Sequence, residues 1–361
     1  MTHLAGLLTG EIAAKGPVSV GRYMELALGH PDFGYYQSAD PFGASGDFIT
    51  APEISQIFGE LIGIWCAVVW RGMRSPERVN LVELGPGRGT LMADALRAAA
   101  MEPEFRAAIH LHLVETGKGL RHRQKETIAK AHPDVTPQWH CGIESLPEGP
   151  TIFIANEFFD ALPMRQFQKT SEGWREKLIG VADNGGFRFV LSPPLTTPPP
   201  VGEELWDAEA EAVAEVSPAS LNIARAIGEK VATQGGAALI IDYGHDSPGF
   251  GDTLQAVKSH GFTDPLADPG EADLTAHVDF AAIGSAAGLG GGAVFGPLAQ
   301  GIFLNRLGIE TRTAALVESA TAGQAEEIQG AVARLTNADQ MGTLFKALAV
   351  MPAAAAPPPG F

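Results

Sequence analysis

The sequence predicts an α/β fold built on a largely parallel sheet, with an N-terminal helical extension and an inserted lobe. From residue 79 to 155, short apolar runs alternate with amphipathic segments, which is the pattern of strands joined by crossover helices. A glycine-rich turn at 85–89 follows the first of these strands. After residue 163, polar strand-like segments and a run of prolines interrupt the pattern, so we expect an insertion that covers one end of the sheet.

The composition fits a soluble globular protein with an ample core, because 45% of its 361 residues are hydrophobic. It has 42 acidic and 25 basic residues, and the resulting net charge of −17 repels polyphosphate. We therefore expect no nucleic-acid partner unless a local basic face exists. Two cysteines, Cys66 and Cys141, cannot build a disulfide framework or a Cys-rich zinc site, and no other metal site is expected.

The N-terminal extension is predicted to cover residues 1–75. An amphipathic helix is indicated by an apolar stripe of Leu4, Leu7, Leu8 and Ile12. The stretch 54–69 keeps a helical period but is interrupted by polar residues, so it predicts a core helix and no membrane insertion. Thr50 and Glu53 have the spacing of a capping box. The N-terminus lacks the pattern of a secretory signal, and we expect a cytoplasmic protein.

The remaining residues, 76–361, are predicted to form the sheet domain. Its strands are expected at 79–84, 109–115, 135–141, 151–155 and 237–243. Helices are expected at 88–100, 117–131 and 203–233. The inserted lobe covers about 164–233, with two or three strands at 164–190 and an exposed proline-rich connection at 192–200. The proline-rich tail 352–361 is predicted to be loose.

The turn after the first strand is the most informative segment. Glu83 ends a buried strand, and Gly85, Gly87 and Gly89 then open a helix. In parallel sheets, ligands bind at such carboxyl ends. The glycines have neither the spacing of the dinucleotide fingerprint nor the lysine of a P-loop, and Glu83 suits a cationic ligand. The string resembles the first motif of class I S-adenosylmethionine-dependent methyltransferases; the alternative is a tight strand-to-helix turn.

Two further segments fit a nucleoside-containing cofactor. Glu115 ends the second strand, where an acid can accept hydrogen bonds from two ribose hydroxyls. NAD enzymes place an acid there too, so Glu115 does not decide between cofactors. In the methyltransferase fold, the turn after the third strand lies along the adenine, which implies that Ile143 contacts the base.

The candidate reacting end follows the fourth strand. Asn156 stands there, without the prolines of DNA amino-methyltransferases. Glu157 and Asp160 are three apart, so a helical turn would place both carboxylates on one side, where they can hold a guanidinium and accept a proton. Alternatively, Asn156 or Glu157 caps a short helix and Asp160 anchors a loop.

A polar and aromatic segment precedes the first sheet strand. Asp47, in the Gly46-Asp47-Phe48 string, can fold over the cofactor and bind its ammonium group, which makes it a further candidate for the catalytic set. The alternative is that Asp47 and Thr50 compete as helix caps.

The chain resembles the MidA family, which includes the mitochondrial complex I assembly methyltransferase. The resemblance spans about residues 21–308 and rests on seven strings: GYYQ at 34–37, GDFITAPEISQIFGELIGIW at 46–65, VELGPGRGTLMADALR at 82–97, HLVETGKGLRHRQ at 112–124, ANEFFDALPMRQF at 155–167, IIDYGH at 240–245 and DLTAHVDF at 273–280. It implies a class I methyltransferase fold and protein arginine N-methyltransferase activity.

The resemblance also implies roles for residues. Carried over by motif, S-adenosylmethionine would be bound by Gly85, Gly87, Gly89 and Glu115, while the Gly46-Asp47-Phe48 and Asn156-Glu157 strings would border cofactor and substrate. In the mitochondrial member the target is an arginine of a complex I core subunit. We therefore expect an arginine-bearing protein substrate, such as a complex I subunit.

Other functions remain open at this stage. A non-catalytic assembly chaperone would keep the cofactor fold and an apolar client surface without needing Glu157 or Asp160. A small-molecule methyltransferase would differ in the size of its pocket. An NAD oxidoreductase is the weakest alternative, because the glycine spacing does not fit it.

Overall fold

The computed structural model describes residues 2–38 and 50–361. Its contacts group into two compact units, each assembled from distant parts of the chain. The lobe unit consists of Met1–Phe48, Phe159–Asn222 and Ser247–Asp279, and the sheet unit of Ile49–Phe158, Ile223–Asp246 and Phe280–Phe361. Compact contact groups are not independently folding domains, so the predicted limits at 1–75, 76–361 and 164–233 stay predictions.

The sheet unit has the predicted α/β architecture. Its strands lie side by side in the order β15 (Gly292–Ala299), β16 (Phe345–Pro352), β10 (Gly236–His245), β5 (Thr151–Asn156), β2 (Val79–Leu84), β3 (Ile109–Val114) and β4 (Gln138–His140). The strands from β10 to β4 are parallel, whereas β16 runs antiparallel to both its neighbours. Every residue of β2 and β5 is buried, which explains why both appear in the sequence as short, almost continuously apolar runs.

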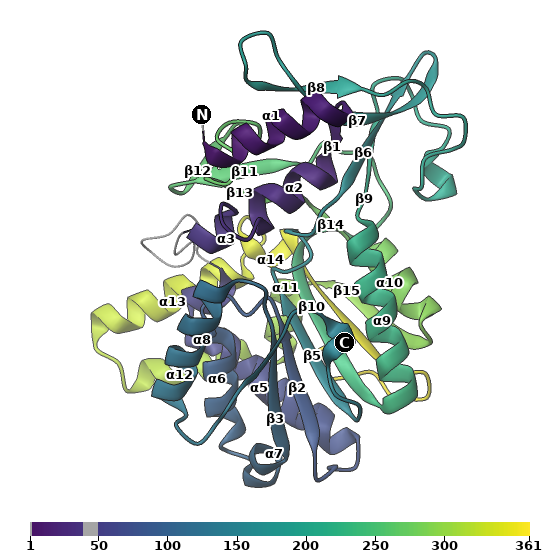
Figure 1. The fold of residues 1–361 in the computed structure, drawn as a ribbon. Coiled ribbons are helices and arrows are strands. Elements are labelled where there is room, and N and C mark those ends of the chain that lie inside the picture. The colour runs from purple at the N-terminus through teal and green to yellow at the C-terminus, as the bar shows by residue number, and fades with distance from the viewer. Residues whose placement is uncertain (1, 39–49) are drawn as a thin grey trace. The chain divides into compact units, whose positions relative to one another are not determined.

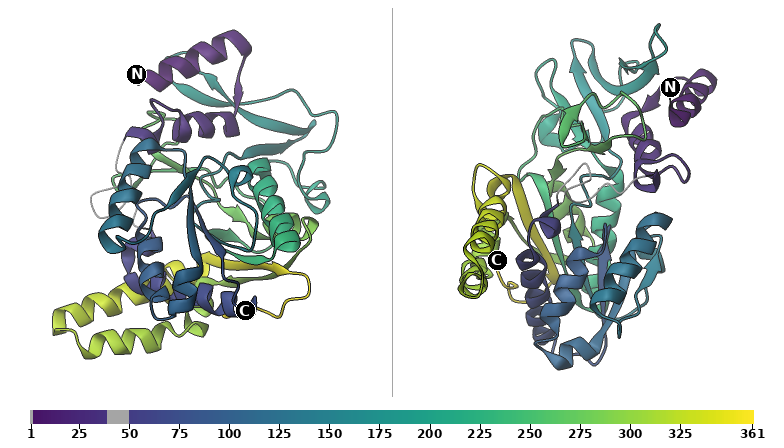
Figure 2. Two further views of the ribbon diagram at one scale, coloured as in Figure 1. Left: turned by 60° about the horizontal axis from the view of Figure 1, so that its bottom comes forward. Right: turned by 90° about the vertical axis from the view of Figure 1, so that its left-hand side faces the viewer.

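Helices cover both faces of this sheet. Figure 1 shows α5 (Gln56–Gly72), α6 (Thr90–Ala99) and α8 (Lys118–Ala131) on one side of the strands, and α9 (Pro218–Gln234) and α10 (Phe280–Leu289) on the other. The short α7 (Pro103–Ala108) follows α6. Further helices are α11 (Gln300–Arg306), α12 (Ile309–Glu318), α13 (Ala322–Thr336) and α14 (Met341–Leu344). In both views of Figure 2, the α12–α13 pair lies at the periphery of this unit.

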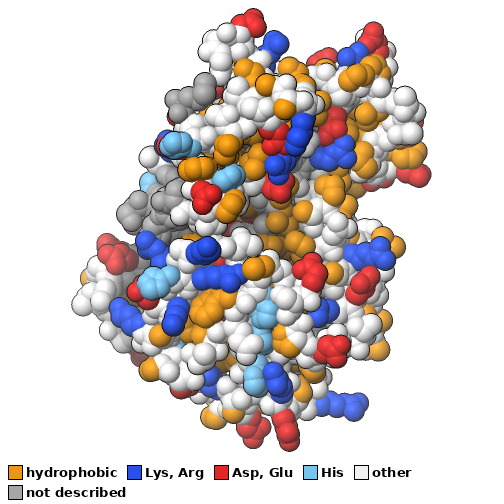
Figure 3. Space-filling view, in the orientation of Figure 1, with side chains coloured by type: hydrophobic (Ala, Val, Ile, Leu, Met, Phe, Trp, Pro, Cys, Tyr) orange, Lys and Arg blue, Asp and Glu red, His pale blue; other side chains and the backbone are white. Residues whose placement is uncertain are grey.

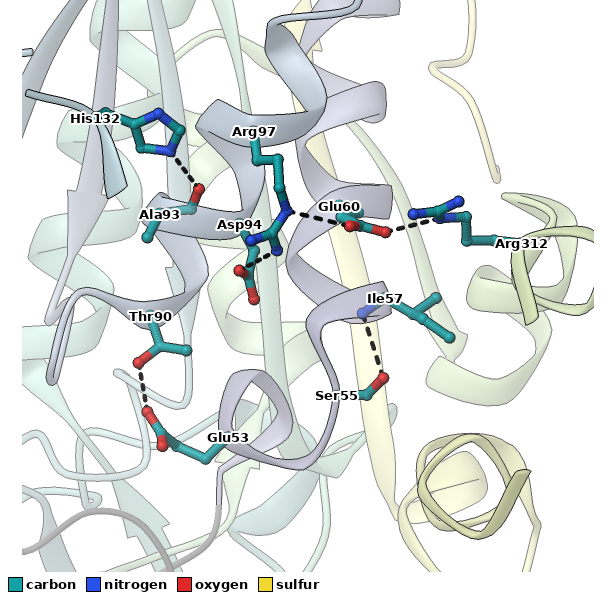
Figure 4. A network of polar contacts seen from close by, with 10 residues as sticks. All are labelled: Glu53, Ser55, Ile57, Glu60, Thr90, Ala93, Asp94, Arg97, His132 and Arg312. Atoms are coloured by element: carbon teal, nitrogen blue, oxygen red, sulfur yellow. Dashed lines mark hydrogen bonds and ion pairs between the residues drawn. The ribbon is translucent and has the colours of Figure 1, made fainter. Parts of the chain in front are cut away.

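Glycines allow α5 and α6 to cross very closely. A Cβ atom added at Gly63 would lie 2.4 Å from the Ala95 carbonyl oxygen, and one at Gly59 would lie 2.6 Å from Asp94 Cβ. The crossing also contains a buried carboxylate, Glu60, which accepts from Arg97 Nε at 3.3 Å and from Arg312 Nε at 2.8 Å (Figure 4). The close crossing and the shared carboxylate link α5, α6 and α12.

The start of α5 differs from the prediction. The helical stretch is broken at Ser55, and a short helix, α4 (Ala51–Ile54), precedes it. The Ser55 hydroxyl caps α5 by accepting from the Ile57 amide at 3.2 Å. Thr50 makes no side-chain cap bond, and the Glu53 carboxylate instead accepts from the Thr90 hydroxyl at 2.5 Å (Figure 4). The predicted capping box is therefore wrong, because the Glu53 carboxylate bonds Thr90 of another helix and does not cap its own.

The lobe unit contains an antiparallel sheet and several helices. The predicted polar hairpin is confirmed as β6 (Arg165–Thr170), β7 (Gly173–Val181) and β8 (Phe187–Leu191), and β1 (Val18–Ser19) and β9 (Val213–Val216) complete the sheet. A second small sheet contains β11 (Gln255–Lys258), β12 (Gly261–Thr263) and β13 (Asp273–Thr275). The helices are α1 (His3–Lys15), α2 (Val20–Gly29) and α3 (Tyr35–Ser38).

Two local predictions fail in or next to this unit. The segment 203–233 is not one helix, since α9 begins only at Pro218 and β9 precedes it. In α1, Leu4, Leu8 and Ile12 are buried as expected, but Leu7 is 49% exposed. Leu7 precedes Leu8 directly, so the two side chains point about 100° apart around the helix and only one faces the core.

The tail also differs from the prediction of a loose segment. The Trp65 indole Nε1 donates to the Pro359 carbonyl at 3.1 Å, and the Phe361 ring lies 5.3 Å from the ring of Phe303. Proline restricts the backbone before folding, so ordering such a tail costs less conformational entropy than its low complexity suggests.

Charge is unevenly distributed over the sheet unit. Helix α8 carries a single acidic residue, Glu126, against five basic ones, Lys118, Arg121, Arg123, Lys125 and Lys130. Figure 3 shows Lys, Arg and His side chains close together over this helix. Among the described residues, no helix combines the length and apolarity needed to cross a membrane.

Candidate functional site

The order of the strands marks one edge of the sheet as a ligand site. From β2 the chain passes to β3 on one side, and it later returns to place β5 on the other side of β2. The strand order thus reverses between β2 and β5, and in open α/β sheets ligands bind beyond the carboxyl ends of the strands at such a point. Gly85 follows β2 and Glu157 follows β5, so two of the predicted segments meet this criterion.

The turn after β2 requires its glycines. Gly85, Gly87 and Gly89 have φ angles of +61°, +50° and +83°, a region that strains other residues. A Cβ atom on Gly85 would also lie 2.8 Å from Cδ2 of Phe158. Gly89 is the N-cap residue of α6 and accepts from the amide of Ala93 at 3.0 Å. The backbone is therefore bent tightly, and Gly85, Gly87 and Gly89 add no side chains where the helix begins.

Glu83 is a buried acid without a hydrogen-bond partner on one oxygen. The residue is 3% exposed, and its Oε2 has no hydrogen bond within the described parts of the chain. Burial raises the pKa of Glu83 to about 8. A cation placed nearby would favour the charged carboxylate, so this residue fits a positively charged ligand.

Glu115, directly after β3, is held by its neighbours. Its Oε1 accepts from the Gly117 amide at 2.7 Å, and its Oε2 accepts from Gln124 Nε2 at 3.2 Å. Burial raises the pKa of Glu115, while the bonds from Gly117 and Gln124 oppose that rise. The Arg121 guanidinium donates to the Glu115 backbone carbonyl, with Nε at 2.7 Å. The acid is thus fixed in place.

Ile143 lies in the turn that follows the third parallel strand. It is 5% exposed and begins a 3-10 turn, Ile143–Ser145, after β4. The backbone at the end of β4 is tied to the end of β3, because the Glu115 amide donates to the His140 carbonyl at 2.9 Å. The predicted contact of Ile143 with an adenine stays a prediction.

Glu157 has an unusual backbone at the end of β5. Its φ is +48°, and its amide donates to the Ile241 carbonyl at 2.9 Å. Its Oε1 accepts from the Ala51 amide at 2.9 Å and from Asn156 Nδ2 at 3.1 Å. A strained residue at the edge of a sheet is typical of functional sites. Asn156 is itself buried, and its Oδ1 has no hydrogen bond in the described part of the chain.

The helical turn predicted at 157–160 is not formed. After β5 the chain makes bends, and the Phe158 amide donates to the fully buried Asp242 Oδ2 at 3.1 Å. Neither the paired carboxylates on one helix side nor the capping alternative therefore describes this segment. The failure has a physical cause, since a positive φ at Glu157 starts the segment outside the helical region.

Asp160 belongs to the lobe unit, whereas Glu157 belongs to the sheet unit. Asp160 is 6% exposed, and its carbonyl accepts from the Ala276 amide at 3.0 Å. Nearby, the Tyr36 hydroxyl donates to Asp273 Oδ1 at 2.9 Å. Burial, together with the charges of Asp273 and Asp160, raises the pKa of Tyr36 far above its usual value. Gly46 and Asp47 lie outside the described residues.

Sequence reasoning missed Gln124, which contacts two of the candidate segments. It is fully buried in α8, with Leu120 and Ile128 as the other buried residues of the helix. The signal was present in the spacing, because a glutamine at i+4 from Leu120 and i−4 from Ile128 occupies the apolar stripe. A polar side chain in that position must find partners inside the protein.

A parallel sheet with this switch point, a glycine turn and two flanking acids is the arrangement expected of a class I S-adenosylmethionine-dependent methyltransferase. Residues 61–298 match the family model described as "Putative S-adenosyl-L-methionine-dependent methyltransferase", and the chain belongs to this family. Its cofactor is S-adenosylmethionine, and the resemblance to the MidA family is confirmed.

Relatives support this assignment over nearly the whole chain. The Drosophila melanogaster "Protein arginine methyltransferase NDUFAF7 homolog, mitochondrial" is 39% identical, over 97% of this chain and 85% of its own. The Homo sapiens protein arginine methyltransferase NDUFAF7, mitochondrial, is 36% identical, over 98% and 84%. A crystal structure from Burkholderia thailandensis, bound to S-adenosyl-homocysteine, has a TM-score of 0.82 and 30% identity, over 96% of this chain and 91% of that chain.

The relatives correct one prediction. Their names place them in mitochondria, and this contradicts the expectation of a cytoplasmic protein. The expectation rested on the missing secretory pattern, which argues against secretion but does not separate one compartment inside the cell from another.

Proposed function

We propose that this protein transfers a methyl group from S-adenosylmethionine to an arginine side chain of a protein substrate. The observation that carries the proposal is the identity of 36–39% with relatives named protein arginine methyltransferases, over almost the full chain. A respiratory complex I subunit is the candidate target that the family resemblance implies.

In this proposal the edge of the sheet at β2 and β3 binds the cofactor. The turn with Gly85, Gly87 and Gly89 lets a ligand approach the backbone, because these three residues add no side chain and other residues would be strained at their positive φ angles. Glu83 supplies a buried negative charge for the cationic end, and its bare oxygen fits that role. Glu115 accepts hydrogen bonds from the ribose, Ile143 contacts the adenine, and Asn156 and Gly46 complete the proposed binding set.

Glu157, Asp160 and Asp47 are the proposed acids of the transfer step. S-adenosylmethionine supplies a methyl group made electrophilic by its sulfonium. The substrate guanidinium must lose a proton as its nitrogen gains the methyl group, and a carboxylate can accept that proton. Glu157 is suited to hold the guanidinium, because the Ala51 amide and Asn156 fix its Oε1.

The test uses proteins from a host strain that lacks the gene, incubated with the purified protein and methyl-labelled S-adenosylmethionine. Labelled dimethylarginine is expected after acid hydrolysis. The Glu157→Gln variant should lose activity by about 100-fold, whereas Glu318→Gln, an exposed acid on α12, should retain it. Label that never enters arginine, or a fully active Glu157→Gln, contradicts the proposal. Intact complex assembly with an inactive Glu157→Gln would favour a chaperone role.

A further inference from the structure

Gln124 connects the two segments proposed to hold the cofactor. Its Nε2 donates to the Gly87 carbonyl at 2.9 Å and to Glu115 Oε2 at 3.2 Å. Its Oε1 accepts from the Trp139 indole at 2.8 Å. The side chain is fully buried, so these bonds are not shared with water. One amide therefore joins the turn after β2, the acid after β3 and the strand β4.

The contacts of Glu115 leave acceptor capacity for a donor from a ligand. A carboxylate has about four acceptor positions, two on each oxygen. The Gly117 amide occupies a position on Oε1, and Gln124 occupies one on Oε2. The Thr116 amide also stabilises the charged carboxylate. About one position therefore remains for a ribose hydroxyl.

Gln124 also fixes the glycine turn. The Gly87 carbonyl is held by Nε2, and Gln124 Cα lies 3.3 Å from where a Cβ atom of Gly89 would stand. The two hydrogens on Nε2 bond different segments. A shift of the glycine turn would break the bond to Gly87, and a rotation of the Glu115 side chain would break the bond to Oε2.

We propose that Gln124 is a positioning residue that orients Glu115 toward the ribose hydroxyls of the cofactor and holds it in register with the glycine turn. This inference rests on the proposed cofactor site. Gln124 does not contact the reacting atoms in this proposal. Its effect is on ligand affinity, and specifically on the part of the affinity that depends on the ribose hydroxyls.

The test measures calorimetric binding of S-adenosylhomocysteine and of its 2′,3′-dideoxy analogue. Wild-type protein should prefer the ligand with hydroxyls. In Gln124→Met, which keeps the length of the side chain but loses its polar atoms, that preference should fall about tenfold or more. Trp139→Phe removes the bond to Oε1 but leaves both bonds of Nε2, and it should keep the preference.

Each outcome has a separate meaning. If the wild type does not bind S-adenosylhomocysteine, the proposed cofactor site is wrong. If Gln124→Met weakens both ligands equally, or keeps the wild-type preference, Gln124 is merely structural and the inference is overturned. Gln124→Glu, which keeps the acceptor for Trp139 and adds a charge facing Glu115, is the second variant and should also lose the preference. Failure of both variants to fold would likewise overturn the inference.

Discussion

The two acids beside the glycine turn, Glu83 and Glu115, differ in the hydrogen bonds that their carboxylate oxygens accept. Glu115 receives hydrogen bonds on both oxygens, whereas Glu83 Oε2 receives none from the described residues. A buried carboxylate oxygen without a donor is costly, and proteins retain such groups chiefly where function needs them. The contrast fits a ligand that brings its own positive charge to Glu83 and hydroxyl donors to Glu115.

The raised pKa of Glu83 predicts how stability depends on pH. Its value is about 8 in the native protein against an ordinary 4.5, so between these values the native state holds a proton that the unfolded state releases. Stability should therefore fall as pH rises through this window. Urea unfolding of the ligand-free protein measures this effect. Between pH 6 and pH 8, the free energy of unfolding of the wild type should fall by about 2 kcal/mol more than that of Glu83→Gln.

The exposed Glu318→Gln variant serves as the control for this measurement and should follow the wild type. Equal pH dependence of wild type and Glu83→Gln would show that Glu83 is charged in the native state. Glu83 would then have a partner that its surroundings in β2 do not reveal.

Among the elements, the crossing of α5 and α6 determines how firmly the first turn of α6 is held. α6 begins at the glycine turn, so any shift of this helix moves the candidate cofactor site. Contacts from α5 and from the preceding α4 restrain it: Glu53 of α4 accepts from Thr90 near the turn, and Glu60 of α5 accepts from Arg97 further along. The close approach of α5 and α6 at Gly59 and Gly63 lies beside the Glu60 contact.

Gly63→Ala should therefore destabilise the protein even though alanine favours helices. The added Cβ would lie 2.4 Å from the Ala95 carbonyl oxygen, a backbone atom that can move only with its helix. We expect a loss of about 2 kcal/mol in the free energy of unfolding, together with weaker binding of S-adenosylhomocysteine. Denaturant unfolding and calorimetry would measure the two effects.

Gly72→Ala provides a matched control in the same helix. Apart from its chain neighbours and the backbone of its own helix, no heavy atom of the described residues lies within 4 Å of a Cβ added there. This change should therefore be neutral or should stabilise by up to about 1 kcal/mol. If the Gly63→Ala protein were as stable as Gly72→Ala, α5 and α6 would not approach each other closely at Gly63.

At the scale of the whole molecule, the sequence predicts those elements whose signal lies within one short segment. Apolar runs at 79–84 and 151–155 correspond to β2 and β5, and the glycine turn between strand and helix lies where expected. These segments carry their own signal, because a buried parallel strand must be apolar along its length. Glu83, Glu115 and Glu157 could be selected as candidates for the same reason: each stands at the carboxyl end of such a strand.

Side-chain contacts and strand pairings between distant parts of the chain could not be predicted. Glu53 bonds Thr90 instead of capping its own helix, and Gln124 reaches Gly87 across the fold. β16 runs antiparallel to β10, a pairing between segments about 100 positions apart that no short-range pattern reveals. The turn at Glu157 is decided by its bonds to Ile241 and Ala51, and a helical spacing of two acids carries no information on those contacts.

The central claim is that the turn at Gly85–Gly89 holds S-adenosylmethionine, with Glu83 and Glu115 on either side. A crystal structure of the protein soaked with S-adenosylhomocysteine tests it most directly. The homocysteine and ribose are expected to lie along this turn, with both ribose hydroxyls within hydrogen-bonding distance of the Glu115 carboxylate. Ligand bound elsewhere, or a turn filled by the protein's own side chains in the complex, would contradict it.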